Sequence, residues 1–403
     1  MAAFTGEPEE GLGPFWPDDV PHVVNTPRFM TLYDRLVTRG LRRDPHAVVL
    51  SASQVETDYE TFDLMSTVAA RALHGLAGSS TPRVALVLER ALDLATTLLG
   101  AVRSGATVLI ADPHSPVRET ARLLELFAPD VVVADGDAGT GHHTVPIQTL
   151  ADIDPGRADW KKPSPSRPAV ALAWGDGIVY HSETSLLSGA RALSEYFMLT
   201  ANSRVAVARS ASSWEWLWAA LAVVEAEGSI LAIHFQDDPI ADLEAARPDV
   251  LWLDASTALG LLSDDVGIID TVRQSCSLLL VSVEEPLPVR LRRRLQRAVG
   301  CPVLTTLGSP ATGIIAASAT QWTLDEAVGT PITGISVHAL DPIANTVIEP
   351  RWDLLTYAGI GVSGQAVALS ADGTTPGGFV SDDILNVGVP GRLDANGLLY
   401  LVS

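Results

Sequence analysis

Lysine is nearly missing from this sequence of 403 residues: Lys161 and Lys162 are the only two, side by side in a loop rich in proline and serine. Lysine and arginine together number 27 against 48 acidic residues, which gives a formal net charge of -21. A surface that binds nucleic acid or an anionic membrane needs clustered cations. The basic clusters here are short, at residues 42–43 and 290–297, so we expect neither partner.

Cysteine is just as scarce, and long hydrophobic runs are missing. Cys276 and Cys301 cannot form a disulfide framework and lack the spacing of metal ligands. No apolar run reaches membrane length, and the first residues lack the charged-then-apolar pattern of a signal peptide. The histidines are scattered, and no Ser-His-Asp order stands out. These absences predict a cytoplasmic protein without a bound metal.

Short apolar runs alternate with helical patterns along most of the chain. The clearest run, residues 83–88, has the pattern of a strand buried on both faces, and a helix at 91–104 follows it. Such alternation is typical of right-handed crossovers on a mostly parallel sheet. Further strands are predicted at 47–50, 107–111, 131–133, 169–173, 203–208, 229–234, 249–253 and 277–282, and further helices at 29–41, 62–77, 116–126, 184–197, 214–226, 239–246, 255–262 and 288–299.

The chain is too long for one simple core, and its texture predicts an α/β protein in four parts. Residues 1–27 form an acidic, proline-rich leader without regular structure. Residues 28–160 and 161–328 form two stacked α/β subdomains with mostly parallel sheets. Residues 329–403 consist of short apolar segments between glycine, aspartate and asparagine turns, which predicts a small β-rich subdomain.

Several short motifs resemble adenylate-forming enzymes, above all the adenylation domains of nonribosomal peptide synthetases, with acyl-CoA synthetases as cousins. The motifs occur in the family's order from about residue 30 to the last residue. The resemblance implies the N-terminal core of that fold, two α/β subdomains and a β-rich one. It also implies a reaction that joins a carboxylate to AMP from ATP and passes the acyl group to a thiol. The matching segments are 57–60, 83–90, 101–106, 112–118, 286–288, 329–332 and 391–397.

The phosphate loop of the family departs from its pattern in this chain. The family has a Ser/Thr/Gly-rich loop ending in Pro-Lys-Gly, whose amides, hydroxyls and lysine bind phosphate. Between the strand at 169–173 and Ile178, this chain has only Trp174-Gly175-Asp176-Gly177. Asp176 would repel a polyphosphate. We therefore expect a simple tight turn here rather than a rewired nucleotide loop.

The family's metal and adenine motif, an aromatic followed by Gly-Pro-Thr-Glu, aligns with residues 307–311. Ala311 stands in place of the glutamate that would hold Mg²⁺, and its side chain offers no oxygen to a hard cation. Leu307 replaces the aromatic residue that stacks on the base. Gly308 matches the family, although a turn glycine needs no ligand to explain it.

The substrate pocket has also changed. The resemblance places Ser210 where amino-acid-activating members have an aspartate that pairs with the substrate ammonium. Trp214 and Glu215 match the Trp-Glu pair that follows it. A buried ammonium without a carboxylate is costly, so we expect no amino-acid selection by the family's usual means.

Two polar landmarks match further positions. Ser381-Asp382-Asp383 resembles a Thr-Gly-Asp motif whose aspartate binds the ribose hydroxyls, and an exposed acidic turn is the alternative. His181 follows the shortened loop, where the alternative is a buried histidine with its hydrogen bonds satisfied. The sequence given ends at Ser403, where the family continues into a small lid with a catalytic lysine; an early natural stop fits the altered motifs better than a shortened sequence does, and both alternatives stay open.

These changes predict an adenylation-domain-like pseudoenzyme, a degenerate and lid-less relative without ATP or Mg²⁺ as cofactor. It would serve as a scaffold or partner of a carrier protein or synthetase module in natural-product assembly. Two alternatives stay open: an ATP-independent enzyme that uses the old cleft for cyclisation or acyl transfer, and an activating ligase with a rewired site. The candidate residues are His181, Ser210, Ser213 and Glu215 for catalysis; Ser210, Trp214 and Leu307 for the substrate pocket; and Gly308 and Asp383 as vestigial nucleotide contacts.

Overall fold

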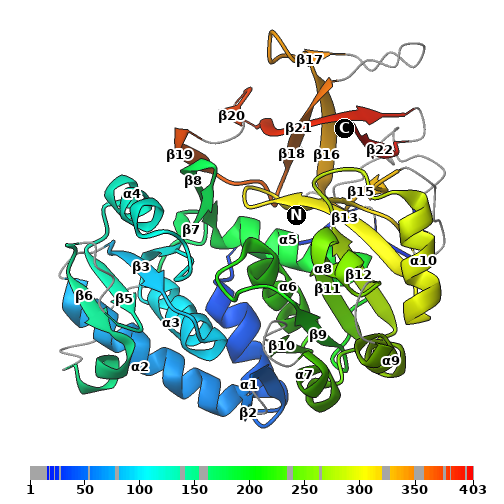
Figure 1. Ribbon diagram of the computed structural model, residues 1–403. Helices are drawn as coiled ribbons and strands as arrows, with labels where there is room; N and C mark the ends of the chain where they lie inside the picture. The colour runs from blue at the N-terminus through cyan, green and yellow to red at the C-terminus, as the bar shows by residue number, and fades with distance from the viewer. Residues whose placement is uncertain are drawn as a thin grey trace, which may run out of the picture.

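The computed structural model arranges the chain as three β-sheets with helices packed between and around them (Figure 1). Two α/β layers lie side by side, and a third, antiparallel sheet lies above them. The structure describes residues 16–17, 19–21, 23–26, 29–52, 55–77, 81–136, 141–153, 162–233, 239–262, 266–319, 327–348, 358–374, 378–381, 383–394 and 397–402.

The first sheet has seven strands in the order β19-β8-β7-β4-β3-β5-β6. Its central strands are parallel and their side chains are buried on both faces, as the continuous apolar runs of the sequence require. Strands β8 and β19 extend it with antiparallel pairs. The strands are β3 (Arg83–Val87), β4 (Thr107–Ile110), β5 (Val131–Ala134), β6 (Thr144–Pro146), β7 (Pro168–Trp174), β8 (Asp176–Ser182) and β19 (Ser370–Thr374).

The second sheet has nine strands in the order β15-β14-β13-β12-β11-β9-β10-β1-β2. The strands from β13 to β1 in this order are parallel. Antiparallel strands flank them, β14 and β15 on one side and β2 on the other. The strands are β1 (Val48–Ala52), β2 (Val55–Asp58), β9 (Arg204–Val207), β10 (Ser229–Ala232), β11 (Val250–Asp254), β12 (Leu278–Ser282), β13 (Val303–Ser309), β14 (Gly313–Ala317) and β15 (Thr330–Pro331).

The third sheet is antiparallel and has the order β17-β16-β18-β21-β20, with β22 paired to β21. It contains only segments from the last part of the chain, as the short apolar segments predict. The strands are β16 (Ile335–Leu340), β17 (Val347–Ile348), β18 (Ala358–Gly364), β20 (Gly378–Phe379), β21 (Leu385–Leu393) and β22 (Leu399–Leu401).

Helix α5 joins the two α/β layers, because it contacts β7 and β8 of the first sheet and β14 of the second. Helix α6 packs against α5 and contacts β9, β10 and β14 of the second sheet. The helical segments are η1 (Asp34–Thr38), α1 (Arg39–Arg43), α2 (Tyr59–Ala77), α3 (Ala91–Arg103), α4 (Val117–Phe127), η2 (Ile147–Asp152), α5 (Glu183–Tyr196), α6 (Trp214–Glu225), α7 (Pro239–Ala246), α8 (Ala255–Gly260), α9 (Val266–Ser275) and α10 (Val289–Val299).

The α/β architecture predicted from the sequence is confirmed, with a β-rich part at its end. Sheet membership, however, crosses the predicted boundary between residues 160 and 161. Strands β1 and β2 belong to the nine-stranded sheet, whereas β7, β8 and β19 belong to the seven-stranded one. The division of the chain into two α/β subdomains between residues 160 and 161 therefore stays a prediction, because the two sheets exchange strands across this boundary. In the described part of the chain, every helix is too short or too polar to cross a bilayer.

Candidate functional site

The connection between β7 and β8 is a tight turn at Gly175 and Asp176. This glycine has a φ of +59°, in the left-handed region that residues with a Cβ rarely adopt. Trp174 pairs with Gly177 directly across the turn. The hairpin therefore has no loop of free amides at the position where the resemblance places a phosphate loop.

The backbone of β8 is also committed on both sides. Its residues pair with β7 along one edge and with β19 along the other, in a register that joins Tyr180 to Ser370 and Asp176 to Thr374. A strand between two antiparallel neighbours directs its amides alternately to each of them. The amide of Leu369 continues this contact by donating to the carbonyl of Tyr180 at 2.7 Å. The β8 amides thus serve the sheet.

The charges near this turn are paired within the chain. The Asp176 carboxylate lies 3.3 Å from a guanidinium nitrogen of Arg122 on α4, and it stays largely exposed. The ammonium of Lys162 forms an ion pair with Asp34 on η1. Its neighbour Lys161 lies outside the described residues. Lys162, the one lysine among the described residues, therefore already has a carboxylate partner on η1.

Gly308 lies at the carboxyl end of β13, where the indole of Trp214 covers it. A Cβ at Gly308 would lie only 2.6 Å from a ring carbon of Trp214 and 2.5 Å from the carbonyl oxygen of Gly313. Trp214 also contacts Trp252 edge to face, with ring centroids 6.4 Å apart. Leu307 is 1% exposed and belongs to the hydrophobic core. Packing against aromatic rings accounts for the glycine here.

Trp218 occupies the centre of the same region and is fully buried. Its indole approaches Gly189 on α5 so closely that a Cβ there would lie 2.3 Å from the ring. Gly313, with a φ of +66°, faces the other side of the ring, and a Cβ there would lie 2.8 Å from it. The space between α5, α6 and the β13–β14 turn is therefore filled by one tryptophan.

His181 lies beside this tryptophan and is fully buried. Its ring meets the Trp218 ring edge to face at 5.5 Å, and its Nε2–H donates to the carbonyl oxygen of Pro310 at 2.8 Å. Burial lowers the pKa of His181 to about 4. The imidazole is therefore neutral near pH 7, and its Nε2 already has a hydrogen-bond partner. Both are expected for a core histidine whose hydrogen bonds are satisfied.

The serines before α6 have structural partners. Ser213 is the N-cap of α6, and its hydroxyl accepts a hydrogen bond from the Trp216 amide at 3.1 Å. The hydroxyl of Ser210 lies 2.7 Å from that of Ser212. Glu215 is 4% exposed, and burial raises the pKa of its carboxyl although Arg209 lies 3.5 Å away. The sequence neighbours Ser210, Ser213 and Glu215 thus do lie together, on one helix start.

Asp383 lies apart from these groups, in an exposed turn before β21. Its carboxylate accepts a hydrogen bond from the Ser381 hydroxyl at 2.9 Å. Burial lowers the pKa of the nearby His338 below its ordinary value, and the negative charge of Asp383 opposes this effect only in part. Asp382 lies outside the described residues. The geometry is that of a hydrogen-bonded acidic turn.

The segment 366–369 covers the site; the sequence predicted it as a short apolar segment of the β-rich part, and the structure places it in a turn before β19. Its first three residues are 3%, 8% and 4% exposed. The Ala368 amide donates to the Ala311 carbonyl at 2.8 Å, which ties this segment to the β13–β14 turn. Ala311 is itself fully buried. The apolar run of the segment was visible in the sequence, but its place over a turn formed some 55 residues earlier was not.

Comparison with known proteins relates the chain to a family over part of its length. The family model described as AMP-binding enzyme matches residues 37–173, less than half of the chain. ATP-bound MatB from Rhodopseudomonas palustris has the same fold, with a TM-score of 0.79 at 18% identity over 93% of this chain and 79% of that one. At this identity the likeness shows a shared fold.

Two further solved structures are similar to this chain. The NpsA N-terminal subdomain of Klebsiella oxytoca, in complex with 3-hydroxyanthranilyl-AMSN, gives a TM-score of 0.76 at 16% identity and covers 93% of this chain and 100% of that one. The o-succinylbenzoate CoA synthetase MenE of Bacillus subtilis gives 0.77 at 15% identity, over 92% and 78%. These identities establish a shared fold. Among the curated proteins, no sequence matches the chain.

Glu183, the first residue of α5, is a buried acid that the sequence analysis did not identify as a candidate. Its Oε2 accepts a hydrogen bond from the Leu32 amide at 2.7 Å, while Oε1 has no hydrogen-bond partner among the described residues. Burial raises the pKa of Glu183 from 4.5 to about 7, against the opposing effects of the Leu32 amide and Arg167. The acid therefore titrates near neutrality.

The Glu183→Gln variant tests this titration. The folded protein holds the Glu183 proton more tightly than the unfolded chain between pH 4.5 and 7, so its stability falls as pH rises through that window. His181 acts in the opposite direction between pH 4 and 6.5, because its folded pKa is lowered. The amide variant keeps an acceptor for Leu32, and it should gain up to about 3 kcal/mol over wild type between pH 5 and 8.5.

Urea unfolding at several pH values measures that difference and cancels the His181 contribution, which both proteins share. Glu119→Gln on the exposed face of α4 is the matched control, with an expected difference near zero throughout. A Glu183→Gln difference that stays constant between pH 5 and 8.5 would show that Glu183 ionises normally.

Proposed function

We propose that this chain is a non-adenylating member of the adenylate-forming superfamily, a pseudoenzyme that acts as a scaffold or partner protein in nonribosomal-peptide or polyketide-type biosynthesis. The fold supports the ancestry, since the chain aligns with ligases over more than nine-tenths of its length. Fold alone does not fix activity. The proposal therefore rests on the residues at the nucleotide positions.

The observation that carries the proposal is the tight turn at Gly175 and Asp176. Phosphate binding at such a turn depends on free backbone amides and a positive charge. Here β8 begins at Asp176 and is paired on both edges, and the nearby Arg122 forms an ion pair with the Asp176 carboxylate. Adenylyl transfer relies on preorganised cations around the reacting phosphorus. The turn has no extended loop of free amides, and its neighbouring cation already has a carboxylate partner.

The magnesium and adenine positions do not fit a magnesium nucleotide either. Ala311 is buried, has no side-chain oxygen, and offers its carbonyl to Ala368. Trp214 covers Gly308, where the resemblance places the base. Among the described residues, no three His, Cys, Asp or Glu side chains group together as metal ligands. The cleft positions are occupied by side chains of the protein itself.

The role in natural-product assembly comes from the motif resemblance to synthetase adenylation domains. A carrier protein or synthetase module is the partner that this resemblance suggests. An intact hydrophobic core around Trp218 and His181 supports a scaffold role, because a chain that has lost its chemistry keeps its fold only where the packing is maintained.

Nucleotide binding is the decisive measurement. Thermal unfolding with and without millimolar Mg-ATP should give the same midpoint, because a ligand raises stability only by binding the native state. Pyrophosphate release should stay at background with a panel of amino acids and of aryl and alkyl carboxylates. MatB from Rhodopseudomonas palustris, which has been solved with ATP bound, is the positive control. A midpoint shift or pyrophosphate release by this chain would refute the proposal.

The Trp214→Ala variant separates two causes of the expected result. It removes the ring that covers Gly308 but leaves the Gly175 turn and the β8 pairing intact. We expect no gain of nucleotide binding, since the phosphate contacts are still missing. A gain would mean that the ring alone closes a functional site. Transfer of an acyl group to or from a carrier, followed by mass spectrometry without ATP, would instead support the ATP-independent alternative.

A further inference from the structure

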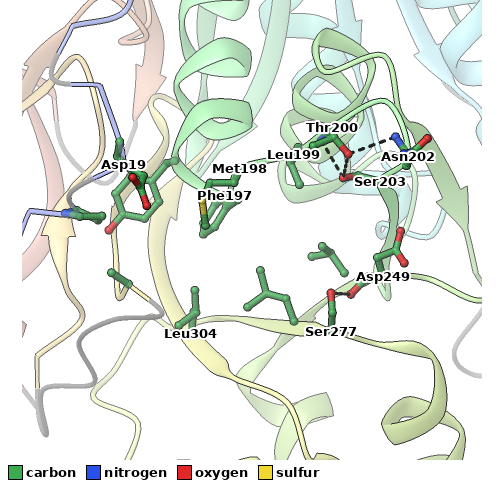
Figure 2. Close-up of a pocket in the computed structure, with 16 residues that line it drawn as sticks. Asp19, Phe197, Met198, Leu199, Thr200, Asn202, Ser203, Asp249, Ser277 and Leu304 are labelled. Atoms are coloured by element: carbon green, nitrogen blue, oxygen red, sulfur yellow. Dashed lines mark hydrogen bonds between the residues drawn. The ribbon is translucent and has the colours of Figure 1, made fainter.

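A cavity of about 470 Å³ lies at the amino-terminal ends of strands in the nine-stranded sheet, whereas the site described above lies at their carboxyl ends (Figure 2). It is lined at the amino-terminal starts of the parallel strands, by Val250 of β11, Leu278 of β12 and Leu304 of β13. In open parallel sheets, ligands typically bind beyond the carboxyl ends of the strands. Ser210 and Gly308 are at those carboxyl ends. The cavity is therefore a separate feature.

The walls of the cavity are apolar and firmly packed. Leu304 is 2% exposed and Leu278 8%. The segment before η1 provides the facing wall, where the Trp16 indole donates to the carbonyl of Val20 at 2.8 Å. Trp16 itself does not line the cavity, but its ring meets that of the lining residue Tyr196 edge to face, with ring centroids 6.4 Å apart. An interior of this kind favours an apolar or aromatic ligand body.

The rim of the cavity is polar and acidic. Figure 2 shows Asp19 on one side of the opening and Asp249 on the other. The Asp249 carboxylate accepts from the Arg204 amide at 2.9 Å, and its backbone carbonyl accepts from Ser277 at 3.0 Å, so both are held in place. None of the described lining residues is lysine, arginine or histidine. The field at the rim favours a cation and opposes an anion.

Met198 marks the turn that forms the upper part of the rim in Figure 2. Its backbone has a φ of +51°, which is rare for a residue with a side chain, and the side chain is 55% exposed. The adjacent Phe197 also lines the cavity. The left-handed conformation ends α5 in a common way, because the Met198 amide donates to the Glu195 carbonyl at 3.2 Å and the Leu199 amide to the Ser194 carbonyl at 2.8 Å. The exposed thioether and the neighbouring ring give the rim an adaptable apolar surface. Aromatic faces also attract ammonium groups.

We propose that this cavity binds a small organic ammonium with an apolar or aromatic body. The ammonium lies at the rim between Asp19 and Asp249, and the body lies against Leu278 and Leu304. The volume falls in the range of roughly 300 to 1,000 Å³ that small-molecule sites occupy. This site is independent of nucleotide chemistry, and it would let a chain without adenylation activity respond to a metabolite.

The test compares two probes of the same shape and opposite charge. Phenethylamine should bind the full chain in isothermal titration calorimetry and raise its thermal midpoint, whereas 3-phenylpropionate should do neither. Asp19→Asn should weaken phenethylamine binding about threefold or more. Asp152→Asn on η2, away from the cavity, changes the net charge equally and should leave binding unchanged. Asp19 is exposed, so its variant should fold normally.

A blocking variant gives a second, independent readout. Ala319→Leu places three further carbon atoms into the lining and should abolish binding while circular dichroism stays native. Equal binding of both probes, equal effects of the two aspartate variants, or no binding of phenethylamine would each overturn the proposal. Should Ala319→Leu fail to fold, the charge comparison still decides. None of these outcomes bears on the ATP measurement, so the two proposals fail separately.

Discussion

The Trp218→Ala variant is expected to lose about 3 to 5 kcal/mol of unfolding free energy, the range for removing a large aromatic side chain from a core. Trp218 has no exposed surface and lies between α5, the β13–β14 turn and His181. These surroundings belong to three different segments, so they cannot collapse together into the space. Urea unfolding followed by far-ultraviolet circular dichroism measures the loss. Trp214→Ala, at a partly exposed tryptophan, should cost less.

A double-mutant cycle with Gly189 makes this prediction sharper. In the wild-type background, Gly189→Ala places a methyl 2.3 Å from the Trp218 ring, and overpacking should cost about 1 to 3 kcal/mol. In the Trp218→Ala background the same change occurs in a helix interior with room, where alanine is favoured over glycine by about 1 kcal/mol. The sign of the Gly189→Ala effect should therefore reverse. Additive effects would contradict the close contact of these residues.

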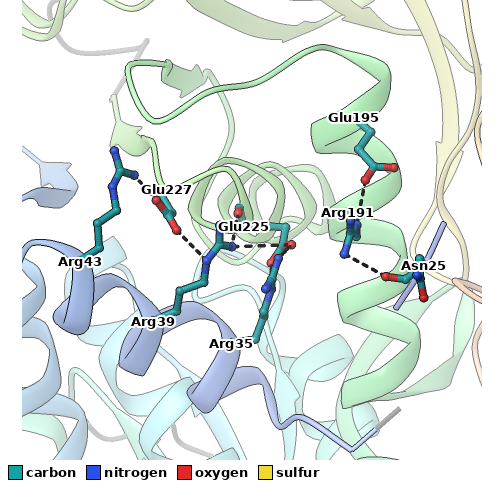
Figure 3. A network of polar contacts seen from close by, with 8 residues as sticks. All are labelled: Asn25, Arg35, Arg39, Arg43, Arg191, Glu195, Glu225 and Glu227. Atoms are coloured by element: carbon teal, nitrogen blue, oxygen red, sulfur yellow. Dashed lines mark hydrogen bonds and ion pairs between the residues drawn. The ribbon is translucent and has the colours of Figure 1, made fainter. Parts of the chain in front are cut away.

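Removing Arg35 is the second change with a large expected effect. Arg35 donates to both carboxylate oxygens of Glu225, which is 5% exposed, in the network of Figure 3. Arg39 and Arg43 extend the same helix face toward Glu227. Arg35→Ala leaves a buried carboxylate without its main partner, which typically costs about 3 to 5 kcal/mol. Urea unfolding at low and high salt measures the loss, which should depend only weakly on salt.

Arg43→Ala is the matched control, because the chemical change is the same and only burial differs. The Arg43 side chain is 52% exposed, and exposed pairs contribute about 0 to 1 kcal/mol. A similar loss in both variants would show that helix propensity or surface charge matters here, rather than burial of Glu225. The double variant Arg35→Met with Glu225→Leu should recover much of the stability, since an apolar pair needs no charge partner.

The sequence predicted most strands because buried parallel strands read as continuous apolar runs. Strand β13 was missed, since Thr305 and Thr306 interrupt its run. Their hydroxyls are satisfied by carbonyls of Val328 and Val281, at 3.0 and 3.4 Å. Polar residues whose partners come from distant segments cannot be recognised as buried from local pattern. Helix α9 was missed for a related reason, because half-buried residues dominate its apolar face.

The sequence predicted those features of the candidate site that depend only on residues close together in the chain. The short loop around Gly175 indicated a tight turn, and His181 was expected to be buried if it was not functional. The sequence could not show that Trp214 covers Gly308 or that β19 joins β8. Both facts depend on contacts between segments far apart in the chain. Ser213 was a candidate catalytic residue in the sequence, and only the fold identifies it as a helix cap.

The pairing of β19 with β8 has a consequence for how the protein is made. Ribosomes release Tyr180 long before Ser370, its partner in the ladder. Until then β8 is the outer strand of its sheet, with unpaired amides that could recruit another nascent chain. A polypeptide interrupted before residue 370 keeps that liability permanently. The pairing with β19 therefore protects this edge only after the chain has been made as far as residue 374.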